Sequence, residues 1–245
     1  MNGPIPAIQF HDVRFRYGRK AVLAGASLRV PRGSTTVLLG ANGEGKTTML
    51  RLCLGVLKPR AGDVRVLGRD PIRDARRVRE HVGYVPDKPD VYPWMTAPDL
   101  FRFLKPHYPT WSDREAHEVA ERLDVPMKTK FRAMSRGQGM KAMLAAALGH
   151  DPDVLLLDEP FGGLDPLVRE EVLRSVVSAM GGRQRTVLLV THDLDVAARI
   201  ADRVAVLADG VIVKEGRAAE VAGRPDSEAT PQGLHEALAS VAGGR

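Results

Sequence analysis

The sequence predicts an α/β fold in which helices cover a parallel sheet. Two short apolar runs, "VLLL" at 154–157 and "TVLLVT" at 186–191, have the length of strands buried on both faces. Segments of helical character follow them at 166–180 and 193–201. This alternation indicates strands that run parallel. Because ligands of such sheets lie at the carboxyl ends of the strands, the polar residues that follow each run are the first candidates for a site.

The rest of the chain continues the alternation. Partial apolar alternation with turn signals indicates antiparallel strands at 7–18 and 26–33. An Asp-Gly pair in the middle of 203–216 is a strong hairpin signal. The two apolar runs described above lie in expected strands at 153–160 and 185–193, and further strands are expected at 34–40 and 81–87. The other expected helices are 46–57, 97–105, 112–124, 135–150 and 231–242. The last of these lies in a stretch rich in Gly, Ala, Ser and Pro after Arg217, which is expected to be a loosely packed tail.

Length and composition bound the class of protein. With 245 residues, 44% of them hydrophobic and 27% charged, the chain fits one folded α/β domain with room for a subdomain. Its single cysteine, Cys53, excludes an intramolecular disulfide and is expected to be a small core residue. No apolar run approaches the roughly 20 residues that a membrane span needs. No secretory signal pattern opens the chain, so the protein is expected to be cytoplasmic.

The formal net charge of +6 raises the question of an anionic partner. The most arginine-rich segment, "GRDPIRDARRVRE" at 68–80, also carries Asp70, Asp74 and Glu80, so a solvated helix face explains it more simply than a binding patch. The sequence has no RNA-binding aromatic motif, zinc finger or heptad repeat. Nucleic acid is therefore not an expected partner.

The stretch "LLGANGEGKTTML" at 38–50 holds the first functional motif. Gly40 to Thr47 matches G-x-x-x-x-G-K-[ST], a loop whose glycines let backbone N–H groups converge on a phosphate at the start of a helix. Lys46 is expected to reach the β- and γ-phosphates of a nucleotide, and the Thr47 hydroxyl to bind Mg²⁺. A turn that merely joins a strand to a helix is disfavoured because strand, loop and helix occur in the required order. The expected nucleotide contacts here are Gly40, Ala41, Asn42, Gly43, Glu44, Gly45, Lys46, Thr47 and Thr48.

A second motif is "VLLLDEP" at 154–160. Asp158, at the end of a buried strand, is placed to hold Mg²⁺, and Glu159 to polarise an attacking water. By itself, an apolar run that ends in Asp-Glu is also consistent with a strand that enters a polar turn. Beside the phosphate loop, the catalytic interpretation is favoured.

Together with further motifs, the chain resembles the ATP-binding cassette ATPases. "MSRGQ" at 134–138 is similar to their signature motif, which usually begins Leu-Ser-Gly-Gly-Gln. "FGGLDP" at 161–166 resembles their D-loop, "VTHD" at 190–193 their switch-histidine region, and Tyr17 the aromatic residue that stacks on adenine. The motifs occur in the family's order over residues 7–216. The run from 134 to 160, with "YPTW" upstream, is similar to bacterial subunits that serve exporter-type membrane proteins.

The resemblance implies a fold and an organisation. It implies a P-loop NTPase (RecA-like) core with an antiparallel β subdomain and an inserted α-helical subdomain, all within one domain of residues 1–245. The implied nucleotide-binding core is 1–87 with 153–216, the helical subdomain with the signature motif is 88–152, and the C-terminal tail is 217–245.

The resemblance also implies a mechanism. Two copies would face each other and sandwich two ATP molecules, each held between the phosphate loop of one chain and the signature motif of the other. Ser135 is expected to be the N-cap of the signature helix, so that the positive end of the helix faces the γ-phosphate. The implied signature contacts are Ser135, Gly137 and Gln138, the implied catalytic residues are Glu159 and His192, and the implied Mg²⁺ ligands are Thr47, Asp87 and Asp158.

Three positions depart from the family pattern. Asp87 stands after "GYVP", where glutamine is usual, and is expected to reach Mg²⁺ as a shorter acid. Arg136 replaces the first glycine of the signature, which would add a cation near the γ-phosphate. Glu44 occupies a loop position that is commonly serine or alanine, which would place an anion near the phosphates.

The aromatic residues indicate a partner. Of the twelve Phe, Trp and Tyr residues in the chain, six lie between 92 and 111, where the family builds its helical subdomain and receives a short helix of the membrane partner. They are Tyr92, Trp94, Phe101, Phe103, Tyr108 and Trp111. About half are expected in the subdomain core, and the others in an exposed apolar groove.

The leading hypothesis is an ATP-hydrolysing subunit of a transporter. It would act as a homodimer beneath an integral membrane partner, peripheral on the inner face of the cell membrane. A rival hypothesis is a soluble ATPase of the same fold that serves a cytosolic assembly or regulatory complex. A relative from translation or DNA repair is disfavoured, because fused cassettes or long coiled-coil insertions are expected there. The small extent of the chain after residue 216 favours export over import.

Overall fold

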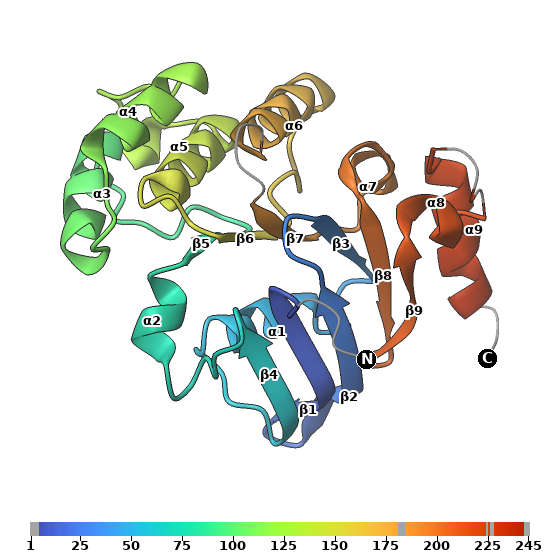
Figure 1. The fold of residues 1–245 in the computed structure, drawn as a ribbon. Helices are drawn as coiled ribbons and strands as arrows, with labels where there is room; N and C mark the ends of the chain where they lie inside the picture. The colour runs from blue at the N-terminus through green and yellow to red at the C-terminus, as the bar shows by residue number, and fades with distance from the viewer. Residues whose placement is uncertain (1–4, 181–184, 224, 226–227, 243–245) are drawn as a thin grey trace. The chain divides into compact units, whose positions relative to one another are not determined.

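A computed structural model describes residues 5–180, 185–223, 225 and 228–242 (Figure 1). The chain divides into two compact units, which are described in turn. The first unit combines Met1–Val78 with Thr186–Arg245, and the second is Arg79–Arg185.

An antiparallel sheet opens the first unit. Strands β1 (Ile8–Tyr17), β2 (Lys20–Val30) and β4 (Ala61–Val66) lie in the order β2-β1-β4 (Figure 1). Ile8 pairs with Val30 on one side and with Val66 on the other. Buried and solvent-facing residues alternate along β1, as the apolar alternation in its sequence predicts. The strand β4 was not expected, because its Gly and Asp interrupt any alternation.

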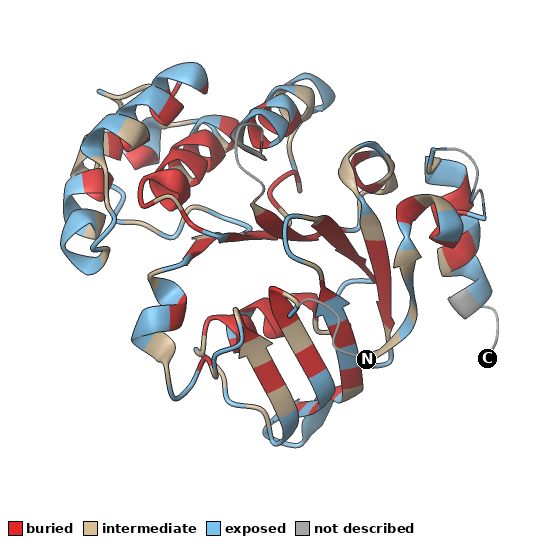
Figure 2. Cartoon of the chain, viewed as in Figure 1, coloured by how far each residue is buried: buried red, intermediate tan, exposed pale blue. Residues whose placement is uncertain are grey.

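The first unit also contains β3 (Thr35–Leu39), β7 (Thr186–Val190), β8 (Arg203–Ala208) and β9 (Val211–Arg217). They lie in the order β7-β3-β8-β9, and all neighbours are parallel except the β8–β9 hairpin. Every residue of β3 and β7 is buried, which agrees with their continuous apolar sequences (Figure 2). The hairpin turns at Asp209-Gly210, both with positive φ, as the Asp-Gly signal predicts.

Helix α1 (Lys46–Cys53) follows β3 and is shorter than expected. The chain leaves it at Gly55, whose φ of 66° is unfavourable for other residues, and a Cβ there would lie 2.0 Å from the Pro71 carbonyl oxygen. Cys53 is buried as expected, and burial raises the pKa of its thiol.

In the described part of the segment after Arg217 two helices pack, so the prediction of a loosely packed tail was wrong there. It forms α8 (Ala218–Val221) and α9 (Pro231–Ala242), which contact each other, and α9 also contacts α7 (Leu194–Ile200) (Figure 1). A Cβ at Gly233 would lie 2.3 Å from the Ala222 carbonyl oxygen. The small residues that suggest a flexible tail instead let these helices approach closely.

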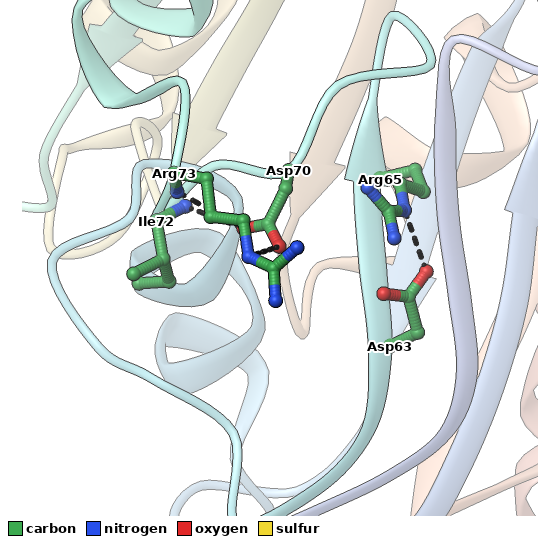
Figure 3. A network of polar contacts seen from close by, with 5 residues as sticks. All are labelled: Asp63, Arg65, Asp70, Ile72 and Arg73. Carbon is green, nitrogen blue, oxygen red and sulfur yellow. Dashed lines mark hydrogen bonds and ion pairs between the residues drawn. The ribbon is translucent and has the colours of Figure 1, made fainter.

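The arginine-rich segment 68–80 is solvated, as expected, but only α2 (Ala75–Arg79) is helical. Its arginines are exposed. Asp70 orders the turn that precedes α2 (Figure 3). The Asp70 carboxylate accepts hydrogen bonds from the N–H groups of Ile72 at 2.8 Å and Arg73 at 3.2 Å. Burial alone would raise the pKa of Asp70, but these bonds and nearby arginines hold it below its usual value.

The second unit contains β5 (Val82–Val85) and β6 (Val154–Asp158), which pair in parallel, and a set of helices. Figure 2 shows β6 in the buried colour along its length, and all five of its residues are buried. The helices are α3 (Ala97–Leu104), α4 (Asp113–Arg122), α5 (Arg136–Leu148) and α6 (Pro166–Met180), with 3₁₀ turns at Lys105–His107 and Phe131–Ala133.

Three of these helices begin at a hydroxyl side chain. Thr96, Ser112 and Ser135 cap α3, α4 and α5, and each accepts a hydrogen bond from the N–H three residues later. These caps satisfy N–H groups that the helix itself cannot pair. Among the described helices, none is long and apolar enough to cross a membrane.

Candidate functional site

The loop between β3 and α1 is pressed against two strands of the first unit. A Cβ at Gly40 would lie 2.5 Å from the Leu207 carbonyl oxygen in β8. Gly45 has a φ of 106°, and a Cβ there would lie 2.8 Å from Cγ1 of Val22 in β2. A larger residue fits at neither position. Gly43, in contrast, has open space where a Cβ would be, so the crest of the loop is accessible.

The loop encloses the ammonium group of Lys46. Lys46 is only 6% exposed, and its Nζ donates to the carbonyl oxygens of Gly40 at 2.7 Å and Ala41 at 3.0 Å. Gly45 caps α1 without a side chain, which leaves the helix start suited to an anion rather than to a capping hydroxyl. Thr47 is half-buried and Thr48 buried. A buried cation at the start of a helix is an arrangement that binds phosphate.

The Glu44 carboxylate has a hydrogen-bond partner that its place in the loop did not reveal. Its Oε2 accepts a hydrogen bond from the backbone N–H of Asp209, at 2.6 Å, in the β8–β9 turn. The same turn is joined to β2, because Gly210 O accepts from Ala24 N at 2.8 Å. The carboxylate thus holds the loop to the hairpin, a contact that an interpretation based on phosphate repulsion alone does not include.

The switch-histidine segment follows the strand next to the phosphate loop. Leu38 of β3 pairs with Val190 of β7, and Thr191 N donates to Leu38 O at 3.3 Å. The loop and the exposed His192 therefore leave neighbouring strand ends of the first unit. Tyr17, at the end of β1, is 43% exposed and packs edge-on against Phe15 with ring centroids 4.9 Å apart.

In the second unit the acidic candidates Asp87, Asp158 and Glu159 lie at the ends of two neighbouring strands. Val85 of β5 pairs with Leu157 of β6, so Asp87 and the Asp158-Glu159 pair follow neighbouring strands. Asp158 is 2% exposed. Its Oδ2 accepts a hydrogen bond from the Tyr84 hydroxyl at 3.4 Å. Tyr84 was not among the expected site residues, although its place two residues before the end of the "GYVP" segment was a usable signal.

Glu159 adopts a strained backbone. Its φ is 46°, which is uncommon for a residue with a side chain. The turn that follows is closed by a hydrogen bond from Gly162 N to Glu159 O at 3.1 Å. Strain of this kind costs about 1–3 kcal/mol and concentrates at functional sites. The turn fixes the backbone that carries the Glu159 carboxylate.

The signature segment starts α5 as expected. Ser135 is the N-cap, with its hydroxyl accepting from Gln138 N at 3.2 Å and the Gln138 side chain accepting from Ser135 N at 2.9 Å. A Cβ at Gly137 would lie 2.3 Å from Cγ1 of Val168, so this glycine lets α5 lie close to α6. Lys141 of α5 is buried and forms an ion pair with Glu171 of α6.

Arg136 is held within its own chain. Its Nη2 donates to the Asp87 carbonyl oxygen at 2.9 Å. The guanidinium thus has a backbone partner in the second unit, a contact that the sequence did not reveal. Its place near a γ-phosphate of a second copy stays a prediction.

The aromatic residues of 92–111 divide as expected. Phe101 is buried and contacts Trp111, which also contacts Tyr108. In contrast, Tyr92, Trp94 and Phe103 are 51%, 61% and 50% exposed. Tyr92 stacks on Trp94 at 4.8 Å and meets Phe103 edge-on at 6.5 Å, and Phe103 lies 5.8 Å from His107. We call Tyr92, Trp94, Phe103 and His107 the aromatic patch.

Tyr108 covers a buried histidine. The rings of Tyr108 and His150 stack with centroids 4.0 Å apart, and His150 is 2% exposed. Burial disfavours the charged imidazolium and lowers the pKa of His150 to about 4. The histidine is therefore neutral near neutral pH.

Comparison with known proteins identifies the family of the chain. Residues 23–162 match the model of the family described as "ABC transporter". The Nod factor export ATP-binding protein I of Burkholderia lata is 36% identical over 222 residues, covering 87% of this chain and 71% of that protein. The nickel import ATP-binding protein of Rhodobacter capsulatus is also 36% identical, covering 89% of this chain and 92% of that protein.

Solved structures share the fold. An ATP-binding subunit of an ABC transporter superposes with a TM-score of 0.82 at 25% identity, covering 96% of this chain and 99% of that one. A dimeric ATP-binding cassette in a post-hydrolysis state, bound to ADP and Pi, superposes with a TM-score of 0.74 at 24% identity, covering 86% and 98%. These matches, together with the phosphate loop and the Asp158-Glu159 pair at the end of β6, place the chain in the ABC transporter family. It is one of the ATP-binding, ATP-hydrolysing members of that family.

Proposed function

We propose that the chain powers transport through a separate membrane-spanning partner, by ATP-driven association of two copies. The observation that carries this proposal is the phosphate loop around the buried Lys46, because a cation enclosed by backbone at a helix start is suited to a polyphosphate. In this proposal Lys46 exchanges its two carbonyl contacts for the β- and γ-phosphates. Tyr17 supplies an exposed ring on which adenine stacks. The other phosphate contacts are Gly40, Ala41, Asn42, Gly43, Glu44, Gly45, Thr47 and Thr48.

Magnesium fits the oxygen donors that the chain offers. Mg²⁺ prefers a few carboxylate or hydroxyl oxygens together with substrate phosphates. The proposed Mg²⁺ ligands are Thr47, Asp158 and Asp87. The ion would neutralise part of the phosphate charge.

Hydrolysis is assigned to Glu159 and His192. A carboxylate that orients a water and accepts its proton is the usual contribution of such a residue. The left-handed backbone of Glu159 supports the assignment. His192 follows β7, next to the strand that carries the phosphate loop, and would contact the γ-phosphate.

The second copy would contribute the signature segment. Ser135, Gly137 and Gln138 form the first turn of α5, whose N–H groups favour negative charge. Leu167, beside the D-loop segment 161–166, is 84% exposed. In this proposal Leu167 lies at the contact surface between the two copies, and one of the similar solved structures is described as dimeric.

The aromatic patch is the proposed docking surface for the membrane partner. It offers three exposed rings and a histidine, which suits a short apolar helix of that partner. The chain would then lie on the inner face of the cell membrane. We propose export as the direction, although the two relatives described above include one named for export and one for import.

In this proposal the core comprises 1–87 and 153–216, the helical subdomain 88–152 and the C-terminal segment 217–245. The alternative is an ATPase that serves a cytosolic complex. We favour the membrane partner because the exposed rings of the aromatic patch suit a short apolar helix of that partner.

Co-purification distinguishes the two. The tagged chain is purified from detergent-solubilised membranes of its native host, with Trp94→Ala and Leu167→Ala as comparison variants. We expect an integral membrane protein to accompany the wild type and Leu167→Ala, and to be lost with Trp94→Ala at unchanged basal ATP hydrolysis. Recovery of only soluble partners would contradict the transport proposal.

A further inference from the structure

Arg136 joins two segments that flank it in the second unit. It is the first residue of α5, directly after the N-cap. On one side its Nη2 donates to the carbonyl oxygen of Asp87, at 2.9 Å. Asp87 follows β5, 49 residues earlier in the chain. A guanidinium has five donors in a fixed plane, so one side chain can contact several backbone groups at once.

On its other side the guanidinium lies against the turn that follows Glu159. A Cβ at Gly163 would lie 3.2 Å from Nη1 and 3.6 Å from Cζ of Arg136, and one at Gly162 would lie 3.7 Å from Nη2. Gly163 also has a φ of 66°, which favours glycine. The two glycines therefore let the guanidinium approach the backbone of this turn.

The contacted turn is the one that holds Glu159. Gly162 N donates to Glu159 O at 3.1 Å, and Glu159 keeps its left-handed backbone within the same turn. A strained residue stays in place only if its surroundings restrain it. Arg136 also has a buried Nε without a hydrogen-bond partner among the described residues. An unpaired buried donor lowers the stability of the fold, so stability by itself does not explain the position of this side chain.

We propose that Arg136 is a positioning residue for hydrolysis. It links the segment at Asp87 to the turn after Glu159 and so fixes the carboxylate that orients the attacking water. The inference rests on the proposed role of Glu159. None of these contacts involves the phosphate loop, so loss of the link lowers the rate of hydrolysis and leaves the affinity of a single chain for ATP unchanged.

The test compares Arg136→Ala and Arg136→Lys with a matched control. The control is Arg122→Ala, because Arg122 also donates to a backbone carbonyl, at 3.4 Å, but to Glu118 of its own helix. Steady-state hydrolysis of MgATP gives kcat and KM, and titration with a labelled nucleotide gives the dissociation constant. For Arg136→Ala we expect kcat to fall about tenfold, the effect of about 1.4 kcal/mol in the transition state, at unchanged KM and affinity. Arg136→Lys keeps the charge and one donor and recovers part of the rate, and Arg122→Ala behaves as wild type.

Hydrogen exchange provides a readout that does not depend on activity. The Gly162 amide should exchange faster in Arg136→Ala than in wild type or Arg122→Ala, because its turn loses a restraint. Unchanged exchange there, an unchanged kcat, or a raised KM at constant kcat would each overturn the link. Absence of turnover in wild type and Arg122→Ala would overturn the proposed function instead, and the exchange rates would still decide whether Arg136 restrains the turn. If Arg136→Ala does not fold, the same comparison is made with Arg136→Lys.

Discussion

At the scale of single residues, the phosphate loop depends on Glu44 as well as on its glycines and lysine. Coulomb's law gives about 2 kcal/mol of repulsion for two unit charges 8 Å apart at an effective dielectric of about 20, before screening. The structure adds an opposing contribution, because the carboxylate accepts the Asp209 N–H at 2.6 Å. Hydrogen bonds to charged groups stabilise a fold by about 1.5–3 kcal/mol. The two effects are of similar size and are separated by substitution.

We expect Glu44→Ala to lower the free energy of unfolding by about 1.5 kcal/mol, because Asp209 N–H loses its acceptor. Glu44→Gln keeps an oxygen in place and should retain most of that stability. Urea unfolding measures the difference. If all three proteins were equally stable, the hydrogen bond would contribute nothing. A gain in MgATP affinity for both variants, shrinking with added salt, would then leave phosphate repulsion as the main effect of Glu44.

The lowered pKa of the buried His150 should make the free energy of unfolding depend on pH. Its pKa is about 4 in the folded chain and about 6.5 when unfolded, so below pH 6.5 the unfolded chain binds a proton that the folded chain does not. Stability contributed by this group is full above about pH 6.5 and is lost as the pH falls toward 4. At pH 5 the loss is about 2 kcal/mol.

His150→Phe keeps an aromatic ring against Tyr108 and cannot titrate. The difference in unfolding free energy between wild type and this variant, measured from pH 7 to pH 4.5, isolates the histidine from other groups such as the exposed His81–Asp153 pair. We expect the difference to move in favour of the variant as the pH falls. A pH-independent difference would mean that His150 titrates normally in the fold.

At the scale of elements, prediction succeeded where the signals are local. The expected helices at 97–105, 112–124 and 135–150 agree with α3, α4 and α5 to within two residues at each end. In each case a hydroxyl residue marks the start, and its hydrogen bond forms within one turn of the chain. The phosphate loop was predictable for the same reason, since its strand, glycines and helix are contiguous in sequence.

Prediction failed where contacts join distant parts of the chain. Arg136 and Asp87 are 49 residues apart, and Glu44 and Asp209 are 165 apart, so no spacing reveals either contact. The C-terminal segment was mispredicted because composition does not distinguish a loosely packed segment from helices that pack through small residues. Gly233 packs closely against Ala222 in this way. Strand β4 has weak alternation of its own and is specified by pairing with β1.

The packing of α5 on α6 gives a prediction at this scale. In Gly137→Ala the new Cβ would lie 2.3 Å from Cγ1 of Val168, and such overpacking costs about 1–3 kcal/mol. Val168→Ala removes that atom. In the Val168→Ala background, Gly137→Ala should therefore be neutral or stabilising, because alanine favours helix over glycine by about 1 kcal/mol.

Thermal or urea unfolding of the two single variants and the double variant forms the test. An equal loss for Gly137→Ala in both backgrounds would show that Val168 is not the residue that requires glycine. In that case the requirement would lie outside the contact between α5 and α6.

At the scale of the whole molecule, the candidate residues are divided between two compact units. The first unit carries the phosphate loop and His192, and the second carries Asp87, Asp158, Glu159 and the signature segment. The proposed mechanism adds a second division, between two copies of the chain. In that mechanism nucleotide binding brings the copies together and hydrolysis releases them. The two steps depend on different residues and can be uncoupled.

Glu159→Gln uncouples them most directly. The amide is nearly isosteric and keeps an oxygen for the water, but it is a far weaker base, and loss of general-base assistance typically lowers rates by about 10² to 10⁴. Binding depends on the phosphate loop, which this change leaves intact. The control is the double variant Lys46→Ala/Glu159→Gln, in which Lys46→Ala removes the buried cation of the loop.

The decisive measurement is size-exclusion chromatography of Glu159→Gln with light scattering, with and without MgATP. We expect a monomer without nucleotide, a stable dimer with MgATP, turnover lower than wild type by at least about a hundredfold, and no dimer for the double variant. Near-normal turnover would remove Glu159 from the catalytic role. Slow turnover with a protein that stays monomeric in MgATP would contradict ATP-driven association of two copies.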